Sequence, residues 1–212
     1  MASSPAIDVV ITSSPDVFDI DGPTDLSICL SLTLRHNKPI TLYKRETSLF
    51  DGKILHGGGL TFTDVETGQR VPHSTLNLCY FSSESFSWAT RSQYFTLHPG
   101  KQHVIHTGFT PLSTSGREKT DPRESWVRSL KFAGFKDGQT CRMGISENAF
   151  VKDWFEGTVW KLLGWQMLGW APTTVHTHIS YRVVESSVVT IKRLEADDDI
   201  RLEDVLSVKL TD

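Results

Sequence analysis

The chain has 212 residues, of which 38% are hydrophobic and 22% are charged, and its formal net charge is −3. This length and composition suit a globular chain with a sizeable buried core. They disfavour a nucleic-acid-binding protein, which needs a basic face, because no basic run offsets the acidic balance. No apolar run approaches the roughly 20 residues of a membrane-spanning helix, so we expect no transmembrane segment.

The N-terminus and the cysteines predict the compartment. Residues 1–8, MASSPAID, lack the positive and apolar regions of a secretory signal peptide. The cysteines, Cys29, Cys79 and Cys141, are odd in number and far apart, and no asparagine begins a glycosylation sequon. This pattern is typical of reduced thiols, so we expect a cytoplasmic protein.

The first part of the chain predicts two strands. Residues 6–12 are rich in isoleucine and valine and predict the first one. In residues 27–43, the second, every other position is aliphatic: Ile28, Leu30, Leu32 and Leu34. This period of two places the aliphatic side chains on one face, where a second apolar layer must cover them, so we expect Leu32 to be buried. Pro39 interrupts the strand because it has no amide hydrogen, and residues 40–43 resume it.

The rest of the chain alternates short β-type segments with turns that contain glycine or proline. We predict strands at residues 60–65 and 69–71 (a hairpin), 93–97, 103–106, 139–145, 174–184 with 188–194 as its hairpin partner, and 205–210. Residues 51–59 predict a flexible link, residues 113–125 a long surface loop, and residues 146–155 the one short helix. We therefore expect a single all-β domain over residues 1–212, an immunoglobulin-like antiparallel β-sandwich, with a β-barrel as the alternative.

Three short motifs resemble a known sandwich. Residues 38–40 (KPI), 44–49 (KRETSL) and 94–100 (YFTLHPG) resemble the small non-catalytic domain that precedes the catalytic domain of deuterolysin-type proteases. They are similar also to a group of uncharacterised fungal proteins that join such a sandwich to a tryptophan- and glycine-rich stretch. The resemblance covers about residues 30–170 and implies an immunoglobulin-like sandwich. It implies no peptidase, because the chain has no HExxH helix, and it admits a setting in fungal secondary metabolism.

Residues 148–172 are the strongest anomaly in the sequence. Four of the six tryptophans lie there: Trp154, Trp160, Trp165 and Trp170. Two similar pentapeptides follow each other, KLLGW at residues 161–165 and QMLGW at residues 166–170. A five-residue spacing sets successive rings about 140° apart on a helix and on alternate faces of a strand. Because three glycines also weaken a helix, we expect a loop or short broken helix, with at least one of the last three rings reaching a cavity or solvent.

Three hypotheses fit this tryptophan-rich segment. Residues 146–172 form a lid or insertion that closes one end of the sandwich, with most rings buried. Alternatively, the four tryptophans named above are ligand-binding residues in the wall of a pocket for a hydrophobic small molecule. In the third hypothesis the segment is a surface for a protein partner or a membrane interface, where tryptophan is also favoured.

The sequence offers little evidence for a cofactor or a metal. The glycine motifs of nucleotide-binding loops and of the serine-hydrolase elbow are absent. His176 and His178 share one face of a predicted strand, whereas His103 and His106 point to opposite faces of theirs. A zinc site needs three or four ligands, so we expect no metal and no cofactor.

Two acids next to the tryptophans are the candidate catalytic residues. Asp153 and Glu156 are three apart and would share one face of a helical turn. A poorly solvated carboxyl beside indole rings favours its neutral form and can transfer protons near neutral pH. The alternative is that both acids are ordinary surface charges.

Together these features predict a binding protein with an aromatic-lined site for a hydrophobic small molecule or a protein partner. The alternative is a cofactor-independent cyclase or isomerase of a fungal secondary-metabolite pathway, with Asp153 and Glu156 as acid and base. A closed pocket that contains a carboxylate would favour the enzyme. Tryptophans exposed on a convex surface would favour a binding partner.

Overall fold

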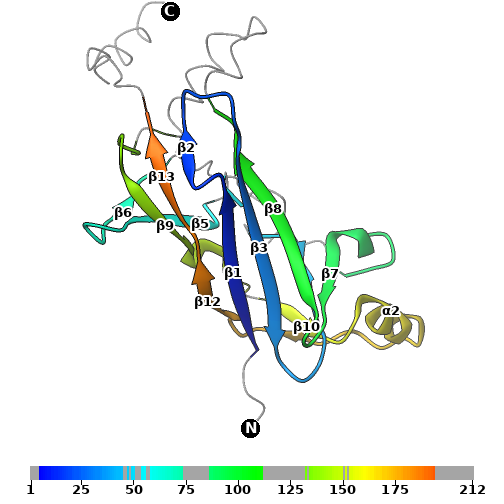
Figure 1. Ribbon diagram of the computed structural model, residues 1–212. Coiled ribbons are helices and arrows are strands. Elements are labelled where there is room, and N and C mark those ends of the chain that lie inside the picture. Colours follow the sequence, from blue (N-terminus) through cyan, green and yellow to red (C-terminus); the bar gives the residue numbers. More distant parts are fainter. Residues whose placement is uncertain are drawn as a thin grey trace, which may run out of the picture.

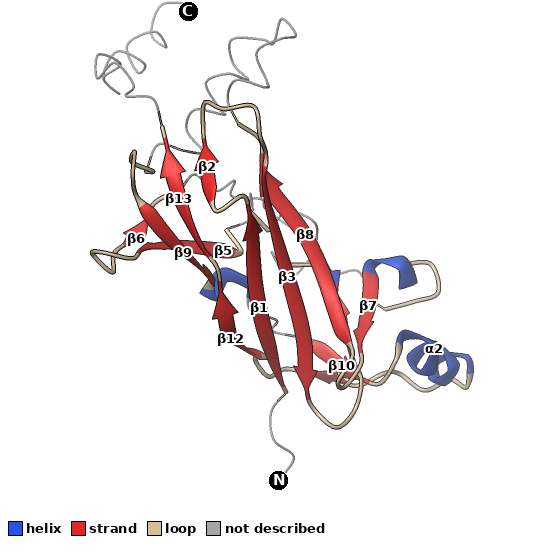
Figure 2. Ribbon diagram, in the orientation of Figure 1, coloured by secondary structure: helices blue, strands red, loops and turns tan. Residues whose placement is uncertain are grey.

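The computed structural model describes residues 5–44, 47, 49–50, 54–55, 58–73, 86–111, 132, 134–149, 151 and 153–193. Strands dominate this part of the chain, and its one α-helix is α2 (Val159–Met167) (Figure 2). Two 3-10 turns, η2 (Arg91–Gln93) and η4 (Glu147–Ala149), complete the regular structure described. The predicted all-β sandwich is confirmed.

The strands form three sheets (Figure 1). Sheet I has the order β12 (Ser180–Ser186), β1 (Ala6–Ser14), β3 (Leu26–Arg35) and β8 (Gln102–Phe109). Sheet II has the order β2 (Val17–Asp19), β13 (Val188–Lys192), β9 (Thr140–Ile145), β5 (Leu60–Asp64) and β6 (Arg70–Val71). Sheet III has the order β11 (Thr174–Val175), β10 (Trp154–Glu156), β4 (Ile40–Tyr43) and β7 (Tyr94–Leu97).

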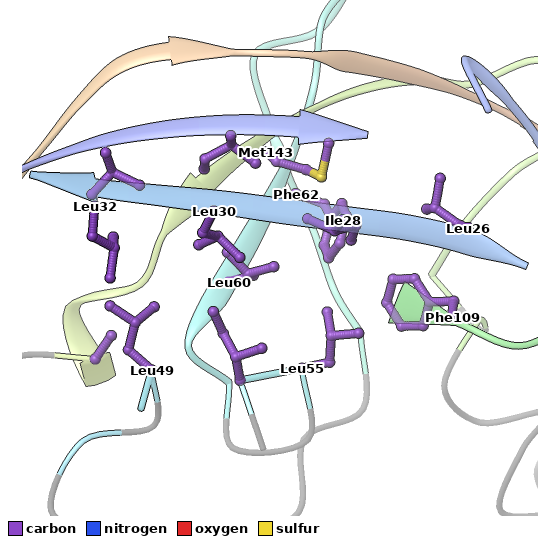
Figure 3. Packing of buried hydrophobic residues seen from close by; sticks show 14 of the residues in the cluster. Leu26, Ile28, Leu30, Leu32, Leu49, Leu55, Leu60, Phe62, Phe109 and Met143 are labelled. Carbon is purple, nitrogen blue, oxygen red and sulfur yellow. The ribbon is translucent and has the colours of Figure 1, made fainter. Parts of the chain in front are cut away.

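The main core lies between sheets I and II. Its centre is the aliphatic face of β3, whose side chains point toward β5 and β9 and meet Leu60, Phe62 and Met143 (Figure 3). Leu32 is fully buried, as its place in the alternating pattern predicted. Cys29, on the opposite face of the same strand, is only half-buried. The period of two in residues 27–35 therefore positions the core.

Pro39 marks the point where the chain leaves one sheet for another. β3 pairs with β1 and β8 in sheet I, whereas β4 pairs with β7 and β10 in sheet III. All four residues of β4 are buried. Ile40 and Leu42 face the main core, and Tyr43 faces a second hydrophobic cluster on the other side. Sheet III thus separates the main core from the cluster beneath α2.

The first two and the last two described strands run side by side, one pair in each large sheet. β1 pairs with β12 in parallel, and β2 pairs with β13 in parallel. Between β12 and β13, the amide of Ser187 donates to the carbonyl of Ile11 over 2.9 Å. β13 therefore continues β12 into sheet II, where it also pairs with β9. The prediction that residues 188–194 fold back on residues 174–184 as a hairpin is wrong.

Two further local predictions need correction. The predicted strand at residues 174–184 is two strands in different sheets, β11 and β12, separated by residues 176–179. The predicted helix at residues 146–155 contains only η4 and the beginning of β10, and the α-helix begins later, at Val159. The glycines and the spacing of the tryptophans had argued against a regular helix at α2. The side chains that pack on sheet III nevertheless favour one.

The remaining sequence predictions concern a hairpin, a flexible link, a surface loop, the last strand and a transmembrane segment. The hairpin at residues 60–71 is confirmed as β5 and β6. Ile54 and Leu55, within the segment expected to be a flexible link, are buried in the main core. The predicted loop at residues 113–125 and the predicted strand at residues 205–210 lie outside the described residues. No helix among the described residues has the length and apolarity that crossing a bilayer requires.

Candidate binding surface

The N-terminus of α2 is fixed to sheet III by hydrogen bonds. Thr158 caps the helix, since its hydroxyl accepts from the amide of Lys161 over 3.2 Å. The amide of Val159 donates to the Thr96 hydroxyl of β7 over 3.1 Å. The Thr41 hydroxyl of β4 donates to the carbonyl of Gly157 over 2.7 Å. The helix therefore starts from a fixed position on β4 and β7.

The C-terminus of α2 is a Schellman motif. Gly169 adopts a φ of +79°, and its amide donates to the carbonyl of Gln166 over 3.0 Å. The amide of Trp170 donates to the carbonyl of Trp165 over 2.9 Å. These two bonds satisfy carbonyls that the last turn leaves free. They also place Trp170 directly at the end of the helix.

The inner face of α2 packs on sheet III. Leu162 and Leu163 are buried in a cluster with Tyr43 of β4, Tyr94 of β7 and Phe86. The side-chain amide of Gln166 donates to the carbonyl of Phe86 over 2.5 Å. Burial of two leucines and a satisfied polar group explains why this short segment holds a helical conformation despite Gly164.

The outer face of α2 is apolar and exposed. The exposed fractions are 69% for Trp160, 73% for Met167, 70% for Leu168 and 65% for Trp170. Lys161 is the only charged residue of the helix. We call these four side chains, together with Trp88, the aromatic surface; Trp88 is 48% exposed. The expectation that at least one ring of the repeat reaches solvent is confirmed by Trp160 and Trp170.

Cations lie against the rings of this region. Trp88 and Trp160 meet edge to face, with ring centroids 5.8 Å apart. The guanidinium of Arg91 lies 5.0 Å from the Trp88 ring centroid. The ammonium of Lys161 lies 4.9 Å from the centroid of Trp165. Both distances fit cation–π contacts, which hold the charges beside the aromatic surface.

An open groove of about 500 Å³ lies between α2, η2 and β7. Tyr94, Val159 and Trp160 are among its lining residues, and the polar ones are Arg91, Ser92, Thr96, His98 and Thr158. No carboxylate is among the described residues that line it. Among its described lining residues, the groove therefore offers hydrogen-bond donors and positive charge, and no carboxylate.

The four tryptophans that were predicted to bind a ligand do not all lie at one site. Trp160 and Trp170 lie on the aromatic surface, and Trp165 is partly buried against the cluster beneath α2. Trp154 is buried in the main core instead. Its indole N–H donates to the carbonyl of Thr177 over 3.1 Å, so it anchors the segment after β11.

The two predicted acids do not line the groove, and each has a polar partner on the surface. They are not on a helical turn, because Glu156 is the last residue of β10 and Asp153 directly precedes this strand. Asp153 contacts Nδ1 of His176 at 2.7 Å, and Glu156 contacts Nζ of Lys38 at 2.6 Å. Both carboxylates are well exposed to solvent, at 42% and 45%. This environment is that of surface charges.

The described histidines do not gather with other side chains that could ligate a metal. No group of three or more histidine, cysteine, aspartate or glutamate side chains gathers among the residues that the structure describes. His176 and His178 lie outside the regular strands. In β8, His103 is half-buried and His106 is exposed, in agreement with the predicted opposite faces.

Sequence reasoning missed Trp88 and Arg91. They come from the turn before β7, more than 60 residues from α2 in the chain, so no local pattern connects them with the tryptophan repeat. The one sequence signal for Trp88 and Arg91 is their spacing of three residues within a stretch that contains no aspartate or glutamate. No protein-family model matches this chain, and no curated protein matches its sequence.

Proposed function

We propose that this protein is a binding protein and that the aromatic surface is its contact site. The observation that carries the proposal is the outer face of α2 and the turn that ends it, where four large apolar side chains are each more than 60% exposed. A helix that is apolar on all sides is normally buried on all sides. Contiguous exposed apolar side chains mark interaction sites, because leaving them in water is unfavourable.

The shape of the site favours an extended partner over a small molecule. Small-molecule sites usually enclose most of their ligand, whereas this groove is open and the large apolar side chains stand on the helix beside it. An extended apolar partner would cover Trp160, Met167 and Trp170 together. The groove would then receive a polar or anionic group of that partner next to Arg91.

The alternative of a cofactor-independent enzyme finds no support in the geometry. Asp153 and Glu156 are solvent-exposed; Asp153 is hydrogen-bonded to His176, and Glu156 is paired with Lys38. General acid or base catalysis requires the group within hydrogen-bond reach of the substrate. We keep the cytoplasmic location and the fungal setting as proposals; the free thiols of Cys29 and Cys141 support the first.

Binding of 1-anilinonaphthalene-8-sulfonate tests the proposal, because this probe combines an apolar ring system with an anionic group. We expect its fluorescence to rise with the wild-type protein. The rise should be lost in a variant with Trp160→Gln, Met167→Gln, Leu168→Gln and Trp170→Gln. The matched control is Val104→Thr with Val184→Thr, which removes exposed apolar groups from sheet I. Equal fluorescence of the control and the α2 variant would refute the proposal.

A further inference from the structure

We propose that the partner of the aromatic surface is a lipid bilayer with anionic headgroups. This inference rests on the proposed function and specifies the partner of the same site. It is carried by the composition of the outer face of α2, by the charge distribution around it and by its position in the molecule.

The outer face of α2 offers apolar contact with few directional groups. Trp160, Met167 and Leu168 project from it, and Gln166 is already bonded to the carbonyl of Phe86. A protein interface of ordinary size carries about one hydrogen bond per 100–200 Å², and the outer face of α2 offers few groups for them besides the indole N–H groups and Lys161. A bilayer requires none in its hydrocarbon layer. Exposed tryptophan also suits the interface in particular, because its indole N–H can remain among the headgroups.

Among the described residues, the charged side chains next to this surface are cationic, although the chain as a whole carries −3. The described residues 86–111, which carry Trp88 and the groove, contain no aspartate or glutamate. Residues 157–184, which contain α2, contain none either. Arg91 and Lys161 lie next to the rings. The described carboxylates nearest to α2 along the chain, Asp153 and Glu156, have cationic or histidine partners of their own. This distribution complements an anionic headgroup layer.

The position of α2 permits access to a flat partner. The helix lies at the margin of the molecule, next to β7 and away from the strands of sheet II (Figure 1). Met167, Leu168 and Trp170 follow one another where the helix ends, and the Schellman motif holds that end in place. A bilayer can therefore take up these three side chains while the groove and Arg91 remain at headgroup level.

Sedimentation with phospholipid vesicles tests this inference. The probes are vesicles of phosphatidylcholine alone and of phosphatidylcholine mixed with phosphatidylserine. We expect the wild-type protein to sediment with the mixed vesicles, and the fourfold glutamine variant of the aromatic surface to remain in solution with both. Tryptophan emission of the wild type should shift to shorter wavelength on binding.

A charge variant separates electrostatic attraction from insertion. Each cation near an anionic surface contributes about fivefold in affinity, so Arg91→Gln with Lys161→Gln should weaken binding to the mixed vesicles by about 25-fold. Arg142→Gln with Lys136→Gln removes the same charge from exposed positions elsewhere and should change affinity little. Equal losses in the two charge variants would refute docking at this surface.

The outcomes distinguish this inference from the function on which it rests. If the wild-type protein binds the naphthalene probe at the aromatic surface but neither vesicle, the bilayer is the wrong partner and the binding function stands. If it instead self-associates through α2, seen as a concentration-dependent mass that the fourfold variant abolishes, the partner is a second copy. Absence of binding to the probe as well would overturn both.

Discussion

Asp8 lies near the start of β1 and is buried between two arginines from neighbouring strands. Arg182 of β12 donates from Nε to its carboxylate over 2.8 Å, and Arg35 of β3 donates to the other oxygen. The hydrogen bond from Arg182, followed by that from Arg35, lowers the pKa of Asp8 below its ordinary value of 3.8. The carboxylate thereby ties together three adjacent strands of sheet I.

The lowered pKa of Asp8 predicts a dependence of stability on pH. Because the folded protein holds this carboxyl ionised more strongly than the unfolded chain does, its contribution is complete above about pH 4 and disappears as pH falls through the folded pKa. In urea unfolding, Asp8→Asn should therefore be less stable than the wild type at neutral pH, and the two should converge in acid. Asp16→Asn, at an exposed position, is the control. A difference that stays constant from neutral to acidic pH would contradict this assignment.

At the scale of one element, α2 shows how one repeated sequence serves two purposes. The first Leu-Gly-Trp, residues 163–165, continues the helix, and the second, residues 168–170, ends it. The difference lies in the environment, because Leu162 and Leu163 bury themselves on sheet III whereas Leu168 is exposed. Gly164 has room for a Cβ with no atom within 4 Å, and Gly169 has a φ of +79°.

These two glycines predict opposite effects of the same substitution. Gly164→Ala should stabilise the protein by about 0.5–1 kcal/mol, because it removes glycine's entropic cost within a helix. Gly169→Ala should destabilise it by about 1–2 kcal/mol, because an L-residue is strained in the left-handed conformation. Urea unfolding of the two variants under identical conditions compares the free energies directly. If both substitutions changed stability in the same direction, the helix would not end where the structure places it.

Local patterns predicted part of the candidate site. The five-residue spacing correctly implied that the rings of the repeat do not share one side, and Trp160 and Trp170 are exposed. The same pattern did not distinguish Trp154, because its burial depends on Thr177, 23 residues further along the chain. The expected loop or short broken helix is present as the short helix α2, and Gly169, counted as weakening a helix, ends it.

At the scale of the whole molecule, the period of two predicted strands and a sandwich but not which sheet each strand joins. β3 and β4 were expected as one interrupted strand, and they lie in different sheets. β12 and β13 also separate, because pairing with β1, β2 and β9 decides their place. Such pairings depend on residues far apart in the chain, and no local periodicity contains them.

The central claim is that α2 has one face that stabilises the fold and one face that is free to bind. The most direct measurement is the free energy of unfolding of the fourfold variant with Trp160→Gln, Met167→Gln, Leu168→Gln and Trp170→Gln, compared with the wild type. Because these side chains are exposed and glutamine favours helices about as well as leucine does, we predict a change within about 1 kcal/mol. A loss of several kcal/mol would show that the outer face belongs to the core and would contradict the claim.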